Sequence, residues 1–101
     1  MQSRDAIERV NRLLALWQRY RAELQETGAS KRVLTLVDTL FERLTMTISG
    51  AARRLDVTPP AARKMIEKLE AAGILTEVTC RQPNRIYLAR EIYEVVSAEA
   101  D

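Results

Sequence analysis

Apolar residues recur every three or four positions along the N-terminal part of the chain, between residues 5 and 26. This spacing is that of one face of an α-helix, so it predicts a single long amphipathic helix. We expect Ser3 to cap the start of this helix and Gly28 to end it, because glycine readily adopts the left-handed backbone angles that follow a last turn. The apolar stripe consists of Ile7, Val10, Leu13, Leu14, Leu16, Trp17, Tyr20 and Leu24.

The long helix has more apolar surface than a compact core beside it needs. At about 1.5 Å per residue it would extend for roughly 33 Å. Part of the stripe has the heptad spacing of a helix that pairs with a second copy, interrupted by Arg21, and this part predicts a homodimer. The stripe also suits packing against its own domain or against a neighbouring domain absent from this chain, and the pattern leaves these alternatives open. The heptad positions are Ile7, Val10, Leu14, Trp17 and Leu24.

Two shorter helical patterns follow the first helix. Ser30 precedes the first of them, which we expect over residues 31–43, and Thr47 is expected to cap the second, over residues 48–55. The segment at 45–48 is rich in residues that favour strands. The buried face of the first helix would comprise Val33, Leu34, Val37, Leu40, Phe41 and Leu44, and that of the second Ile48, Ala51 or Ala52, and Leu55.

A third helical pattern begins with a strong start signal. Thr58 supplies a hydroxyl cap, and Pro59 takes the first helical position, where the missing N–H of proline breaks no hydrogen bond. Gly73 ends the helix, which we expect over residues 59–72. We expect the short segment before Thr58 to form a tight turn between two helices. The buried face of this helix would comprise Ala62, Ile66 and Leu69.

The pattern changes from helical to strand-like after Gly73. Residues 74–79 and 85–89 suit two strands joined by a polar loop, and a short closing helix is expected around residues 92–96. Two short helices joined by a tight turn and followed by a hairpin are the elements of a winged helix-turn-helix. We therefore predict a mainly α fold with a small β-hairpin, divided into an amphipathic linker or dimerisation helix (1–28), a winged helix-turn-helix domain (29–97) and a frayed tail (98–101).

Charge is distributed unevenly along the chain, although the formal net charge is only +2. Between residues 53 and 90 there are eight basic and four acidic residues, a net charge of +4, whereas every charged residue after Arg90 is acidic. Such a concentration of positive charge is expected where one region of a protein faces phosphate. The distribution indicates duplex DNA as the partner, with the helix at 59–72 as the recognition helix in the major groove.

The predicted recognition helix presents a polar face opposite its buried one. Arg63 suits a bidentate contact to guanine and Lys64 a contact to phosphate, whereas Glu67 repels phosphate unless it accepts from cytosine. We expect backbone N–H groups at the start of this helix, and side chains of the hairpin loop and of the preceding helix, to contact the DNA backbone or minor groove. The predicted DNA contacts are Arg53, Arg54, Thr58, Pro60, Ala61, Arg63, Lys64, Lys68, Arg81, Gln82, Asn84 and Arg85.

The chain contains no histidine and a single cysteine, Cys80. Histidine is the usual general base near neutral pH and the usual nitrogen ligand of zinc, so histidine-dependent catalysis and histidine-bound metal are excluded. The carboxylates of Asp38, Glu42 and Asp56 suit solvated helix faces better than a catalytic pair. We expect no enzyme activity, no cofactor and no metal in this chain. A lone thiol and the lack of an apolar run of membrane length favour a cytoplasmic location.

Two segments carry a resemblance to a known family: VTPPAARKMIEKLEAAGIL at residues 57–75 and RQPNRIYLAREIYEVV at residues 81–96. They resemble the helix-turn-helix, wing and closing helix in the C-terminal region of Fic-family proteins. The resemblance extends over residues 32–96, and residues 16–24 look like the linker helix that leaves the catalytic domain of that family. The His-Pro-Phe motif and the Gly-Asn-Gly-Arg segment of the Fic catalytic domain are absent from this chain.

The resemblance implies either a stand-alone relative or, as we favour, a C-terminal fragment of a protein-adenylylating enzyme whose N-terminal catalytic domain is absent from this chain. Its winged helix would bind DNA and serve transcriptional regulation or localisation. The alternative is a protein-interaction module that positions or recruits the target of a Fic-type transferase, because winged helices also bind proteins.

Overall fold

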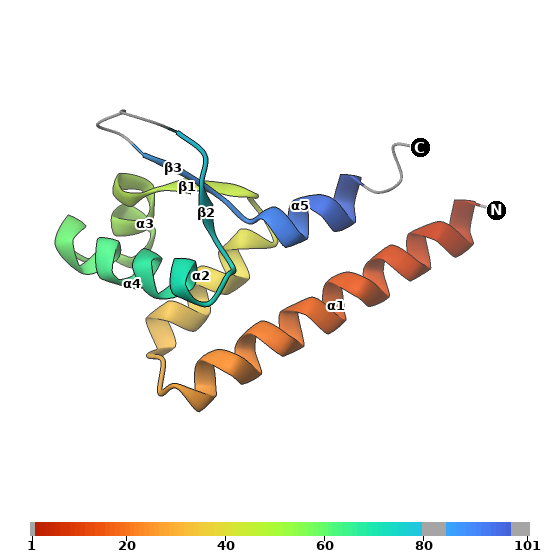
Figure 1. The fold of residues 1–101 in the computed structure, drawn as a ribbon, viewed down its shortest axis with the longest axis horizontal. Coiled ribbons are helices and arrows are strands. Elements are labelled where there is room, and N and C mark those ends of the chain that lie inside the picture. The colour runs from red at the N-terminus through yellow and green to blue at the C-terminus, as the bar shows by residue number, and fades with distance from the viewer. Residues whose placement is uncertain (1, 80–84, 98–101) are drawn as a thin grey trace.

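The computed structural model describes residues 2–79 and 85–97. Over these residues α1 lies along one side of the molecule, and the other helices and a small sheet gather over its C-terminal half (Figure 1). The fold is mainly helical with a small antiparallel sheet, as predicted. The elements are α1 (Gln2–Glu26), α2 (Lys31–Leu40), β1 (Thr45–Thr47), α3 (Ile48–Leu55), α4 (Pro59–Ala71), β2 (Thr76–Glu77), β3 (Ile86–Leu88) and α5 (Arg90–Ser97).

The sheet has β3 at its centre, between β1 and β2, and both pairings are antiparallel. Leu88 of β3 lies opposite Thr45 on one side and opposite Thr76 on the other. The sequence predicted the hairpin of β2 and β3 and the strand character of residues 45–47, but not that this segment adds a third strand to the hairpin. The hairpin loop, residues 80–84, lies outside the described residues.

The helix starts and ends lie close to the predicted positions. The hydroxyls of Ser30, Thr47 and Thr58 each accept a hydrogen bond from the backbone N–H three residues further on, at 3.3, 3.0 and 3.3 Å. Gly28 and Gly73 have φ angles of 77° and 80°, which confirms that both follow helices in the left-handed conformation. These local signals therefore mark the starts of α2, α3 and α4 and the ends of α1 and α4.

Two predicted helix limits are wrong. α1 already includes Gln2, so Ser3 lies inside the helix and does not cap it. The sequence before Asp5 holds no glycine or proline that would stop the helix there. α2 ends at Leu40 rather than at residue 43, because the N–H of Glu42 turns back to the carbonyl of Thr39 at 2.9 Å in a tighter final turn.

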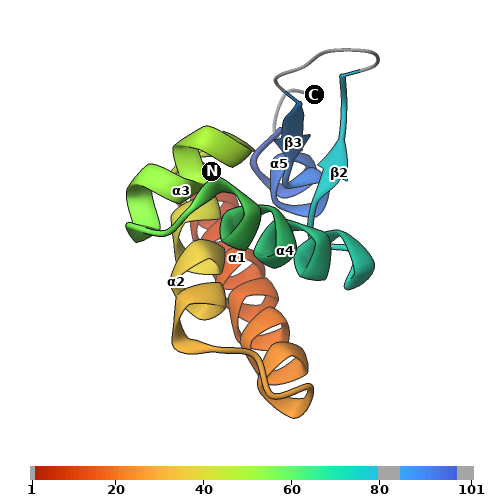
Figure 2. The same ribbon diagram turned by 90° about the vertical axis from the view of Figure 1, so that its left-hand side faces the viewer.

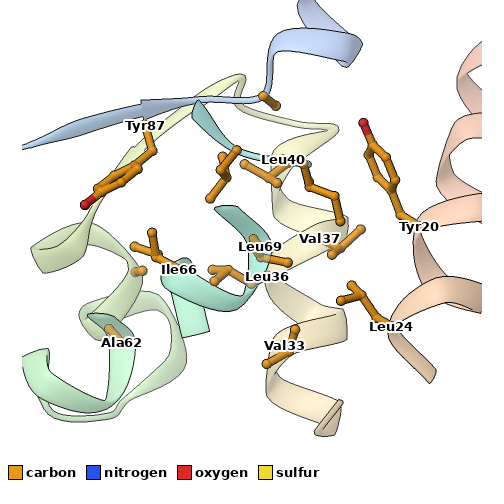
Figure 3. Packing of buried hydrophobic residues seen from close by; sticks show 14 of the residues in the cluster. Tyr20, Leu24, Val33, Leu36, Val37, Leu40, Ala62, Ile66, Leu69 and Tyr87 are labelled. Atoms are coloured by element: carbon orange, nitrogen blue, oxygen red, sulfur yellow. The ribbon is translucent and has the colours of Figure 1, made fainter. Parts of the chain in front are cut away.

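The core lies between α2, α4 and β3, and α1 closes it on one side (Figure 3). The predicted inward face of α4 is confirmed, because all three of its side chains have no exposed surface. α2 contacts both α1 and α3, so it buries Leu36 and Thr39 beyond the predicted set, whereas Leu34, Phe41 and Leu44 are only half-buried. The largest completely enclosed side chains are Tyr20, Leu36, Val37, Leu40, Ile66, Leu69, Ile74 and Ile92.

A buried tyrosine fastens α1 to α5. The Tyr20 hydroxyl donates to Oε1 of Glu91 at 2.8 Å, and Nη2 of Arg19 donates to the same oxygen at 2.7 Å. Burial alone would raise the pKa of Glu91, but the hydrogen bonds from Arg19 and Tyr20 outweigh burial and hold this pKa below its ordinary value of 4.5. Burial and the neighbouring carboxylate raise the pKa of Tyr20, so its hydroxyl remains a donor.

A second polar contact fastens α1 to α2. The indole Nε1 of Trp17 donates to Oδ1 of Asp38 at 2.7 Å. Nη1 of Arg21 pairs with the same oxygen at 3.2 Å, and its guanidinium lies over the Trp17 ring, 5.1 Å from the centroid. Arg21, which interrupts the heptad pattern, therefore holds α1 on its own domain.

The apolar stripe of α1 divides into two faces. Leu16, Tyr20 and Leu24 are at most 8% exposed and pack into the core. In contrast, Ile7, Val10 and Leu14 are 60%, 61% and 49% exposed. The heptad prediction is therefore wrong for Leu24, which is buried in its own domain, whereas Trp17 is partly buried against the same core. Among the predicted heptad positions, the exposed ones are therefore those in the N-terminal half of α1.

Candidate nucleic-acid interface

An open groove of about 500 Å³ lies between the starts of α3 and α4 and the base of the hairpin formed by β2 and β3, which we call the wing. Figure 2 views the molecule from this side, with α3 and α4 in front and the wing rising beside them. The groove is lined by Thr47, Ile48, Ser49, Pro59, Pro60, Arg63, Lys64, Glu67 and Arg85.

α4 contributes most of the polar lining. Its start is fixed by Thr58 and Pro59, and its apolar face is locked into the core, so helical periodicity turns Arg63, Lys64 and Glu67 towards the groove. Nε of Arg63 lies 3.8 Å from Oε2 of Glu67, and both side chains are more than half exposed. The described lining residues carry three positive charges against one negative charge. The groove is thus electropositive and open to a large ligand.

The wing holds Arg85 at the edge of the groove. Nε of Arg85 lies 3.6 Å from Oε2 of Glu77, which also lies 3.5 Å from the Thr79 hydroxyl. That hydroxyl oxygen accepts from the N–H of Ile86 at 3.1 Å. Sequence reasoning selected Arg85 but missed its partner Glu77 and the contact of Glu77 to Thr79. The alternation of Glu77 and Thr79 along the strand was the available signal, because residues two apart lie on the same face.

The structure brings some of the predicted contact residues together and separates others. Pro60, Arg63, Lys64 and Arg85 line the groove. Thr58 and Ala61 lie beside it at the start of α4, and Lys68 is exposed one turn beyond Lys64. Three further predicted residues, Arg81, Gln82 and Asn84, lie outside the described residues. Thr47 and Ser49, at the start of α3, line the groove but were not predicted from the sequence.

Arg53 and Arg54 are not part of the groove. They occupy the last turn of α3, whereas the groove is at the first turn of that helix. Together with Arg43 they border a separate hollow of about 300 Å³, and Nη2 of Arg54 pairs with Oε1 of Glu42 at 3.1 Å. Basic side chains in a last turn also complement the negative end of the helix dipole.

The start of α4 offers fewer backbone donors to phosphate than expected. Pro59 and Pro60 have no N–H. The N–H of Ala61 donates to the Thr58 hydroxyl at 3.3 Å, and the N–H of Ala62 donates to the Thr58 carbonyl at 2.9 Å. The N–H groups of residues 59–62 are therefore missing or already bonded, so contacts of α4 beyond its N-cap residue fall to side chains.

Asp38, Glu42 and Asp56, the residues considered for a catalytic carboxylate pair, lie apart in the fold and have structural roles. Asp38 binds Trp17, Glu42 binds Arg54, and Asp56 ends α3 with a left-handed φ of 56°. Over the described parts of the chain, no group of three potential metal-ligating side chains comes together. In the same parts, no helix combines the length and apolar character needed to cross a membrane.

The order of elements defines a winged helix-turn-helix. α3 and α4 pack against each other across a tight turn, and the antiparallel hairpin follows α4 directly. α4 is the second helix of this unit, the position of the recognition helix in proteins of this class.

Several solved structures have a fold similar to that of this chain. The chain is similar to AbfR of Staphylococcus epidermidis (21% identity over 96% of this chain and 71% of AbfR, TM-score 0.56). An AbfR structure bound to DNA matches 96% of this chain and 76% of that chain, at 20% identity and a TM-score of 0.56. YusO from Bacillus subtilis matches at 21% identity and a TM-score of 0.57, covering 98% of this chain and 77% of YusO.

A MarR family protein from Bacillus stearothermophilus also matches, at 20% identity over 98% of this chain and 75% of that protein, with a TM-score of 0.52. At such identities the likeness concerns the fold, which is the winged helix of these proteins. No family model and no curated protein matches the chain. The resemblance to Fic-family proteins therefore finds no support.

Proposed function

We propose that this chain is a winged-helix transcriptional regulator that binds duplex DNA, with α4 as its recognition helix. The observation that carries the proposal is the groove, where exposed cations of α4 face the wing across an open electropositive surface. AbfR, which shares the fold, has been solved bound to DNA, and this supports a DNA-binding role for the present chain.

The dimensions and charges of α4 suit the major groove. The helix has 13 residues and is therefore about 20 Å long, and the major groove, about 12 Å wide, admits an α-helix. Arg63 would donate to guanine, and Lys64 and Arg85 would contact phosphates on either side of it. Contacts between basic side chains and phosphates release counterions, so we expect the affinity for DNA to fall as the salt concentration rises.

A fluorescence-anisotropy titration tests the proposal. A labelled duplex of random sequence is titrated at 50 and 200 mM salt with the wild type and with the double variant Arg63→Ala, Lys64→Ala. We expect salt-sensitive binding, and in the double variant both a weaker affinity and a shallower dependence on salt, because two cations are lost. Absence of binding at low salt, or binding that neither salt nor the substitutions change, would contradict the proposal.

We also propose that two copies of the chain pair through the N-terminal half of α1. Ile7, Val10 and Leu14 are exposed there at spacings of three and four. α5 packs beside α1, and its C-terminal end points towards the N-terminal end of α1 (Figure 1). On α5, Tyr93 and Val96 are 46% and 38% exposed. A two-fold pairing satisfies such a face with an identical one and supplies the second recognition helix that a palindromic DNA site requires.

Analytical ultracentrifugation tests the pairing. We expect the wild type to sediment at twice the chain mass of 11.5 kDa and Val10→Glu to sediment at the chain mass, because a charge is placed in the apolar face. Ala15→Glu is the control, since Ala15 is exposed on another side of α1. A wild type that sediments as a single chain, or two variants that behave alike, would contradict the pairing.

A further inference from the structure

Glu67 is unusual for a residue on a surface that faces phosphate. It is the one acidic side chain among the described residues that line the groove. Its pairing with Arg63 is long, at 3.8 Å, and both partners are exposed, so the pair contributes little to stability. The start of α4 is already fixed by Thr58 and Pro59, and its inner face by the core. The fold therefore does not require a carboxylate at this position.

A carboxylate in the groove opposes binding to arbitrary DNA. It repels phosphate, and it partly neutralises Arg63, one turn before it on the same helix face. An ionised carboxylate can only accept hydrogen bonds, so it must find a donor on a base edge. In the major groove, cytosine presents an amino donor, guanine presents two acceptors, thymine presents an acceptor and a methyl group, and adenine presents its donor beside an acceptor. Cytosine is therefore the base whose major-groove edge offers the best hydrogen-bond donor to the Glu67 carboxylate.

We propose that Glu67 is a specificity-determining residue that selects a cytosine within the DNA site. This inference rests on the proposed function, because it requires α4 to enter the major groove. The loose contact to Arg63 opens easily, which frees the guanidinium for a guanine or a phosphate while the carboxylate accepts from the cytosine amino group. Glu67 thus lowers the affinity for DNA that lacks cytosine at this position, and gains a partner where cytosine is present.

Selection of binding sites from a pool of randomised duplexes tests the assignment, with the wild type and Glu67→Gln compared. Glutamine has the size of glutamate, lacks its charge and forms a bidentate pair with adenine. We expect the wild type to enrich a site with a fixed cytosine, and the variant to enrich the same site with adenine at that one position. On a single random duplex at 50 mM salt, the variant should bind about twofold more tightly, since it removes one charge about 7 Å from phosphate and both water and salt screen the repulsion.

Glu26→Gln is the matched control, because Glu26 is exposed at the end of α1 and does not line the groove. It should keep both the selected sequence and the affinity of the wild type. A Glu67→Gln variant that enriches the same bases as the wild type, or that binds random duplex no better than Glu26→Gln, would overturn the assignment and leave the proposed function intact. A wild type that enriches no duplex would overturn both.

Discussion

Replacement of Tyr20 by phenylalanine isolates the hydrogen bond that ties α1 to α5. The ring of Tyr20 is 1% exposed, and phenylalanine keeps its packing while removing the hydroxyl that donates to Glu91 at 2.8 Å. A hydrogen bond to a charged group contributes about 1.5–3 kcal/mol to folding stability when it is well buried. The Glu91 side chain is 45% exposed and keeps Arg19 and water as partners, so we expect a loss of about 1 kcal/mol.

The pKa of Glu91 gives this loss a dependence on pH. The pKa is lower in the folded chain than its ordinary value of 4.5, so the contact contributes fully above pH 4.5. The contribution is lost as the pH falls through the lowered pKa of the folded state, because the carboxylate becomes protonated. The difference in stability between the wild type and Tyr20→Phe should therefore be constant near neutral pH and shrink in acid.

Urea denaturation followed by circular dichroism measures the effect for the wild type, Tyr20→Phe, Glu91→Ala and the double variant. The protein concentration is held fixed, because pairing of two chains would add to the apparent stability. At pH 7 a loss of about 1 kcal/mol corresponds to a fall in Tm of about 4–8 °C for a domain of this size. We expect the loss from Tyr20→Phe to disappear in the Glu91→Ala background. An undiminished loss in that background, or no loss at pH 7, would refute the reasoning.

Three further substitutions test the packing and the helix limits by the same denaturation assay. Ile66→Ala empties a fully enclosed position in α4 and should reduce the free energy of unfolding by about 2–5 kcal/mol; a loss below that of a surface substitution would contradict the core assignment. Thr58→Ala removes the cap of α4 and should cost about 1 kcal/mol, whereas Thr58→Ser should keep the cap and cost little. Gly73→Ala places a side chain at φ 80° and should cost about 1 kcal/mol or more through backbone strain, since no described atom lies within 4 Å of the new Cβ. Equal stability of Gly73→Ala and the wild type would show that this turn is not left-handed in solution.

Local signals were sufficient to predict the helix-turn-helix and the polar face of α4. Thr58, Pro59 and Gly73 act on the backbone next to them, so their effect can be read without knowledge of the rest of the fold. The inward face of α4 follows from the helical repeat alone. Three of the predicted contact residues that line the groove, Pro60, Arg63 and Lys64, follow from these local patterns.

Features that depend on contacts between distant segments could not be predicted. The stripe on α1 is continuous in the sequence, and only the position of α5 and α2 decides that Leu24 is buried while Val10 is exposed. In the sequence, Arg21 only interrupts a heptad pattern. Its role follows from its pairing with Asp38, which lies on another helix. Arg53 lies on the same helix as Ser49, but the direction of α3 relative to the wing places only Ser49 at the groove.

An NMR titration of the labelled chain with an unlabelled duplex tests the central claim most directly. The account predicts that backbone amide signals shift at the starts of α3 and α4 and at Arg85, and that signals of the exposed part of α1, from Ile7 to Leu14, stay in place. Shifts confined to α1, with the groove unchanged at saturating duplex, would contradict the claim that the groove is the DNA-binding surface.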